Sequence, residues 1–109
     1  MKMRALVVEN DDRTKAWIED TLLSIGHEYS RATNQCDARR MLNLEDFAYV
    51  LLDLEIPVRG NRGVLRVRNG ENLLVEVVQH PHLRAVPVIA MCERTADSPE
   101  LVRRSTEFR

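Results

Sequence analysis

The sequence predicts an α/β domain in which an open parallel sheet is covered by helices on both faces. Three short apolar runs, at residues 5–8, 49–54 and 86–91, are typical of strands buried on both faces of a sheet. The stretches between them carry apolar residues at helical spacing. Strands and helices that alternate in this way favour a doubly wound sheet of parallel strands. A chain of 109 residues predicts a single domain, 1–109.

The first strand and helix are predicted within residues 5–25. The run ALVV at residues 5–8 is followed by ENDD, whose Asp and Asn side chains are good helix N-caps. A helix over about 13–25 follows, and Gly26 is its predicted stop. Its inward face is expected to hold Ile18, Leu22 and Ile25, with Trp17 also in the core.

The middle of the chain predicts a strand, a helix and a second strand. HEYSRA, residues 27–32, is a weak strand pattern and is expected near a sheet edge. CDARRML, residues 36–42, predicts a short helix, and AYVLLDL, residues 48–54, predicts the central strand. The helix is expected to turn Ala38, Met41 and Leu42 inward.

The last third predicts a helix, a strand and a further helix. ENLLVEVVQ, residues 71–79, places Leu73, Leu74, Val77 and Val78 on one helical face, although its β-branched residues leave a strand as the alternative. VPVIAM, residues 86–91, predicts a buried strand. A helix is expected to begin after Ser98, an N-cap residue followed by Pro99.

Polar side chains stand where three of the predicted strands end. Asp53 follows four residues suited to a buried strand, and burying a carboxylate costs several kcal/mol unless a partner compensates for it. Glu9 and Asn10 end the first strand, and Cys92 ends the last. Ligands bind beyond the carboxyl ends of such strands. Two acids and an amide oxygen there form an oxygen cluster suited to Mg²⁺.

The motifs ALVVENDD, YVLLDLEIP and VPVIAM, in this order and spacing, resemble the response-regulator receiver domain of two-component signalling. The resemblance implies a flavodoxin-like sheet and a non-enzymatic, cytoplasmic signalling domain. It implies that Asp53 accepts a phosphoryl group from a histidine kinase or phosphotransfer protein. It also implies that Mg²⁺ is held by Glu9, Asn10, Asp53 and the backbone carbonyl of Glu55, and that Pro57 matches the proline of the following loop.

Several positions depart from the pattern of that family. Asn10 replaces a second acid, which weakens metal binding unless Asp11 compensates. Cys92 replaces the Thr or Ser hydroxyl of the switch, and a thiol is a weak donor. Glu93 replaces a small residue and brings a negative charge to the phosphoryl site. The resemblance therefore leaves an alternative, a degenerate pseudo-receiver that acts as a phosphorylation-independent interaction module.

The chain also departs from the family in its length and in one loop. The resemblance implies a fifth strand and a fifth helix beyond the elements predicted here, so the receiver-like domain is expected to be C-terminally incomplete. Residues 86–91 then form an exposed edge, which predicts a homodimer by strand addition. Residues 58–69 form an Arg/Gly-rich insertion with four arginines. It is expected either to form one arm of a hairpin before Asn69-Gly70 or to lead directly into the next helix.

Other function classes are less well supported. A net charge of −1 gives no electrostatic case for nucleic acid or a membrane surface. His80 and His82 lack a third metal ligand and are expected in a surface turn. Two cysteines are too few for a disulfide scaffold, which favours reduced thiols in the cytoplasm. A metal-dependent phosphohydrolase remains a further alternative, with Glu55 the one candidate for its second acid.

Overall fold

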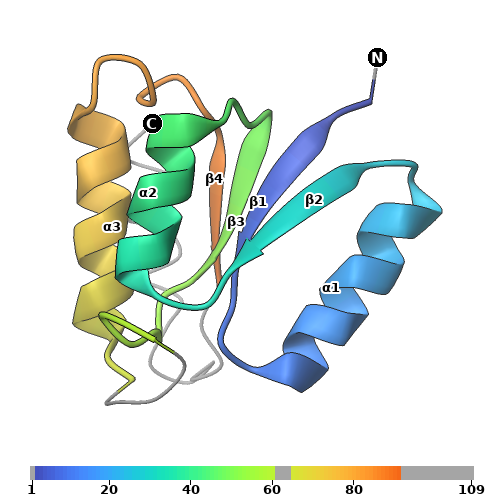
Figure 1. Cartoon of the computed structure of the whole chain (residues 1–109), viewed down its shortest axis with the longest axis horizontal. Coiled ribbons are helices and arrows are strands. Elements are labelled where there is room, and N and C mark those ends of the chain that lie inside the picture. Colours follow the sequence, from blue (N-terminus) through green and yellow to red (C-terminus); the bar gives the residue numbers. More distant parts are fainter. Residues whose placement is uncertain (1, 61–64, 92–109) are drawn as a thin grey trace.

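The computed structural model describes residues 2–60 and 65–91, and this part of the chain forms one parallel sheet with helices on both faces (Figure 1). Its elements, in chain order, are β1 (Arg4–Val8), α1 (Asp12–Ser24), β2 (Glu28–Ala32), α2 (Gln35–Leu44), β3 (Tyr49–Asp53), α3 (Val67–Gln79) and β4 (Val88–Met91). The strand order is β2–β1–β3–β4. The predicted fold class is confirmed, and β2 lies at an edge as expected. Cys92, Glu93 and the helix predicted after Ser98 lie outside the described residues.

The register of the sheet aligns the carboxyl ends of its strands. Val8, the last residue of β1, is the partner of Ala32 in β2 and of Leu52 in β3. Asp53, the last residue of β3, is the partner of Met91 in β4. The residues that follow β1 therefore lie beside the end of β3.

The two faces of the sheet are covered unequally. Helices α2 and α3 lie on one face and α1 lies on the other (Figure 1). Because side chains alternate along a strand, Leu6 and Val8 face α2 and α3, whereas Ala5 and Val7 face α1. The core on the side of α2 and α3 is the larger; its members include Leu6, Val8, Leu42, Val50, Leu52, Leu73, Leu74, Val77 and Val88. The core under α1 is Ala5, Val7, Ile18 and Leu22.

Two expectations about α1 are wrong. Trp17 is 67% exposed and Ile25 is 57% exposed, although both were expected to face the core. Ile18 and Leu22 are buried. Trp17 and Ile25 instead border an apolar groove whose floor includes Leu51 of β3. They are exposed because none of the described helices covers this part of the sheet.

Helix α3 begins four residues earlier than expected, at Val67. Asn69-Gly70 therefore lies inside the first turn of the helix and is not a hairpin turn. The segment before it makes one isolated antiparallel bridge, between Arg66 and Ile56. The backbone N–H of Gly70 donates to the carbonyl of Leu54 (3.1 Å), and a Cβ at residue 70 would lie 2.3 Å from the Leu54 Cα. Only glycine allows α3 to approach β3 this closely.

Candidate functional site

Two buried carboxyl groups meet at the carboxyl end of the sheet. Glu9 directly follows β1 and is 2% exposed, and Asp53 ends β3 and is 7% exposed. The two carboxyl groups interact directly, and this interaction raises the pKa of Glu9. The neighbouring strands predicted from the sequence thus bring Glu9 and Asp53 into direct contact.

The electrostatics of this pair are unfavourable to two full charges. The pKa of Glu9 is raised to about 9, first of all by burial and then by the direct interaction with Asp53 and the charge of Asp53. None of the ion pairs formed within residues 2–60 and 65–91 involves either side chain. A pKa raised this far favours the protonated form of Glu9 at neutral pH.

The backbone after β3 orients Asp53. The N–H of Glu55 donates to Asp53 Oδ1 at 2.9 Å. Further along the same loop, two carbonyls accept hydrogen bonds from the start of α2. The Gln35 N–H donates to the carbonyl of Pro57 (3.0 Å), and the Cys36 N–H donates to the carbonyl of Val58 (2.9 Å). The first N–H groups of a helix have no partner within the helix, so these bonds satisfy the start of α2. They also fix the loop beside Asp53.

Asn10 and Asp11 are placed differently from the carboxyl pair. The Asn10 amide Nδ2 donates to the carbonyl of Thr33 (3.4 Å), which directs the amide toward the end of β2, on the side of β1 opposite to Asp53. Asp11 is exposed and caps α1, accepting from the Arg13 N–H and the Thr14 hydroxyl. The Thr14 hydrogen bond lowers the pKa of Asp11. The Asp11 side chain is therefore engaged in capping, while its backbone N–H donates to Glu9 Oε2 (3.3 Å).

The donors at this site fit a hard cation. Among the described residues no group of three or more His, Cys, Asp and Glu side chains is arranged to hold a metal. The structure brings two carboxyl groups together here, and it does not place the Asn10 amide beside them. Oxygen-only sites that keep several waters are typical of Mg²⁺. A cation could compensate for the burial of the two carboxylates, so this pair fits Mg²⁺ as part of its ligand set.

Arg31 contacts this site and was not singled out from the sequence. Its Nε donates to the backbone carbonyl of Glu9 (3.1 Å). An arginine in a polar edge strand gives no sequence signal of such a contact, because the neighbour it reaches lies on another strand.

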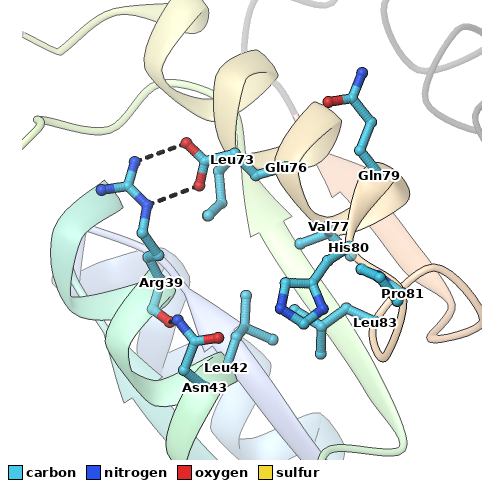
Figure 2. A pocket seen from close by; sticks show the side chains of 10 residues that line it. All are labelled: Arg39, Leu42, Asn43, Leu73, Glu76, Val77, Gln79, His80, Pro81 and Leu83. Atoms are coloured by element: carbon cyan, nitrogen blue, oxygen red, sulfur yellow. Dashed lines mark hydrogen bonds and ion pairs between the residues drawn. The ribbon is translucent and has the colours of Figure 1, made fainter.

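A separate cavity of about 520 Å³ lies between α2 and α3 (Figure 2). Arg39 and Glu76 face each other across it through two hydrogen bonds of 2.7 Å each. Its other lining residues include His80, which lies in a surface turn as expected. These residues belong to the later turns of the helices, and so to the end of the sheet opposite Asp53. The cavity is therefore distinct from the carboxyl site.

The fold is that of response-regulator receiver domains. The phosphorylated cyanobacterial phytochrome response regulator RcpA matches with a TM-score of 0.77 and 19% identity, over 100% of this chain and 76% of that chain. A receiver domain of a Pseudomonas aeruginosa sensor histidine kinase, with magnesium coordinated in its active-site cleft, matches with a TM-score of 0.77 and 20% identity. The match covers 94% of this chain and 76% of that chain. A response regulator from Chloroflexus aurantiacus matches with a TM-score of 0.71 and 23% identity. The match covers 83% of this chain and 66% of that chain.

At these identities the likeness establishes the fold and leaves the chemistry to the residues of this chain. Comparison with protein-family models and with curated proteins finds no match. In the described part of the chain, none of the helices has the length and apolar character needed to cross a membrane.

Proposed function

We propose that this chain is a phosphoacceptor receiver domain of a two-component system, in which Asp53 accepts a phosphoryl group from a phosphohistidine. The donor would be a histidine kinase or a phosphotransfer protein in the cytoplasm. The observation that supports the proposal is the buried, interacting pair of Glu9 and Asp53 at the carboxyl end of a receiver-type sheet. The chain would act as a signalling domain that modifies its own aspartate, not as an enzyme on other substrates.

The chemistry requires little beyond positioning. The Glu55 N–H holds one oxygen of Asp53, so the plane of the carboxylate is fixed. A carboxylate oxygen then bonds to phosphorus while the bond from phosphorus to the imidazole nitrogen breaks. Mg²⁺, held by Glu9, Asn10, Asp53 and the Glu55 carbonyl, would supply neutralisation of the phosphoryl oxygens. Glu9 must release its proton for this arrangement, so Mg²⁺ and the proton compete for Glu9 and metal binding releases the proton.

Cys92 is proposed at the switch position, where its thiol would face the phosphoryl oxygens. A thiol is a weaker donor than a hydroxyl. A phosphorylated state that depends on this contact would therefore be less strongly stabilised than one with Thr at residue 92.

Incubation with a small phosphodonor tests the proposal directly. The wild-type chain with Mg²⁺ should gain the mass of one phosphoryl group, measured on the intact protein, and a chelator should prevent it. Asp53→Asn should gain nothing while keeping the circular dichroism spectrum of the wild type. A folded wild-type chain that takes up no phosphoryl group from any donor would overturn the acceptor assignment.

Asn10 supports a second candidate, a pseudo-receiver that binds partners without being phosphorylated. It brings no charge to the site, and its amide is directed toward Thr33. Under this alternative Glu9 keeps its proton and the domain does not respond to Mg²⁺. The same incubation separates the two candidates, because only the receiver gains mass.

A homodimer through β4 is proposed as a further property of the 109-residue chain. Among the described strands, β4 is the end strand opposite β2 and pairs only with β3. Ile89 in this strand is 54% exposed. An uncovered apolar edge of this kind pairs readily with a second strand.

A further inference from the structure

A single guanidinium group ties the loop between β1 and α1 to β2. Arg31 lies in β2 and donates from Nε to the carbonyl of Glu9 (3.1 Å) and from Nη2 to the carbonyl of Asn10 (3.4 Å). The same Nη2 lies 3.0 Å from Oδ1 of Asp12, the first residue of α1. The Arg31 side chain is 21% exposed, so the guanidinium is largely shielded from water.

Two more hydrogen bonds hold this loop from the same side. The Glu9 N–H donates to the carbonyl of Ala32 (3.0 Å), and the Asn10 amide donates to the carbonyl of Thr33 (3.4 Å). The loop carries two of the four ligands assigned to Mg²⁺. It is thus anchored on β2, opposite to the side where Asp53 lies.

We infer that Arg31 is a positioning residue for the metal site, setting the affinity for Mg²⁺ by fixing the backbone of Glu9 and Asn10. This inference rests on the proposed function. When Glu9 and Asp53 are both ionised, their charges repel and favour separation of the two strand ends. An anchor outside the pair opposes that separation before the cation arrives, and such outer residues typically change metal affinity by about 10- to 100-fold.

The positive charge of Arg31 and its hydrogen bonds to the loop predict opposite effects on the affinity for Mg²⁺. If its positive charge were the dominant effect, removing it would tighten the binding of a cation. The ion pair with Asp12 offsets that charge, so position is expected to dominate. Lysine keeps the charge but lacks the planar fork that binds two carbonyls at once. The positioning role therefore predicts weaker Mg²⁺ binding in both Arg31→Met and Arg31→Lys.

The test is the dissociation constant of Mg²⁺ for the unphosphorylated chain, measured by calorimetric titration below the unfolding temperature of each variant. Arg31→Met should weaken binding about tenfold, at the lower end of the range for such residues. Arg31→Lys should also bind more weakly than wild type. Arg40→Met is the matched control, because it removes one positive charge from an exposed ion pair with Asp37 on α2. Its affinity should equal that of wild type.

The outcomes are distinct. Binding in Arg31→Met that equals or exceeds that of Arg40→Met overturns the positioning role, and so does wild-type affinity in Arg31→Lys. If Arg31→Met fails to fold, Arg31→Lys decides the question in the same titration. A folded wild-type chain that binds no Mg²⁺ contradicts the proposed metal site itself, which separates failure of the function from failure of this inference.

Discussion

At the scale of single residues, the site is defined by two buried carboxyl groups that interact directly. Glu9 and Asp53 are nearly excluded from water, and burial together with the interaction with Asp53 raises the pKa of Glu9 to about 9. A fold gains no stability from such a pair when both members are ionised. Its presence at the end of two adjacent core strands is therefore better explained by a ligand that binds the ionised pair than by folding.

The first prediction is a fall in the free energy of unfolding as the pH rises. In the unfolded chain Glu9 ionises near its ordinary pKa of 4.5, whereas in the folded chain it keeps its proton up to a pKa of about 9. The stability it contributes is complete below pH 4.5 and is lost progressively toward pH 9, by at most about 1.4 kcal/mol per pH unit. Urea unfolding at several pH values, without divalent cations, measures this decline.

Glu9→Gln should remove this decline, because glutamine has no proton to lose. Glu45→Gln, at a half-exposed ion pair with Arg4, is the control for loss of one carboxylate and should keep the decline. If the free energy of unfolding falls with pH equally in wild type and Glu9→Gln, then Glu9 ionises normally in the folded chain.

Glu9 and Asp53 could be predicted from the sequence, but the contacts that neighbouring residues make around them could not. Asp53 stands out because an acid ends an apolar run, and strand alternation indicates that Glu9 lies beside it. The direction of the Asn10 amide and the contact of Arg31 depend on the partner strand β2. No local pattern encodes these contacts, since they join residues more than 20 positions apart.

At the scale of elements, the position of α3 depends on one close approach. The helix begins at Val67, and its first turn packs against the backbone that follows β3. Asn69 is buried and donates from Nδ2 to the carbonyl of Ile56 (2.7 Å), while Gly70 contacts Leu54. These contacts fix the segment that carries Glu55, so the start of α3 is part of the support for Asp53.

Gly70→Ala is expected to destabilise the fold although alanine favours a helix by about 1 kcal/mol. Its Cβ would lie 2.3 Å from the Leu54 Cα, and a backbone atom cannot rotate away. Overpacking of this kind costs about 1–3 kcal/mol, which outweighs the helical preference. Urea unfolding measures the difference, and the rate of Asp53 phosphorylation should fall as Leu54 and Glu55 shift.

Gly26→Ala is the matched control. Gly26 has a φ of 75° and open space around its Cβ position, so alanine there costs about 1–2 kcal/mol of backbone strain without contact to the site. It should lower stability and leave the phosphorylation rate unchanged. Equal phosphorylation rates in both variants would show that the start of α3 does not position Asp53.

The sequence predicted the order and type of these elements but misplaced two details. Asn69-Gly70 is a strong turn signal in isolation, yet tertiary contacts with Ile56 and Leu54 draw both residues into α3. Trp17 was expected in the core because it is large and apolar and adjoins buried Ile18. It is exposed because burial depends on what covers the neighbouring part of the sheet.

At the scale of the whole molecule, the described sheet ends in an apolar edge beside an apolar groove. Strand β4 forms that edge, and Ile89 and Met91 line the groove together with Trp17 of α1. The chain spans 76% of the RcpA chain that it matches. The apolar groove extends from α1, at Trp17 and Ile25, across β3 to β4.

The 109-residue chain is expected to self-associate through this edge. Light scattering from low to high micromolar concentration should show a dimer, with or without Mg²⁺ and beryllium fluoride. Ile89→Lys should shift the chain toward monomer, because a charge on an edge strand opposes pairing. Leu44→Lys, at a residue 74% exposed on α2, should not. A wild-type chain that stays monomeric throughout would contradict the prediction.

The central claim is that Asp53 presents a carboxylate able to hold a phosphoryl group with Mg²⁺. Fluorine nuclear magnetic resonance of the wild-type chain with beryllium fluoride tests this geometry without relying on a donor. We expect bound-fluoride resonances that require Mg²⁺ and that are absent from Asp53→Asn. A folded wild-type chain that shows only free beryllium fluoride at saturating Mg²⁺ would contradict the account.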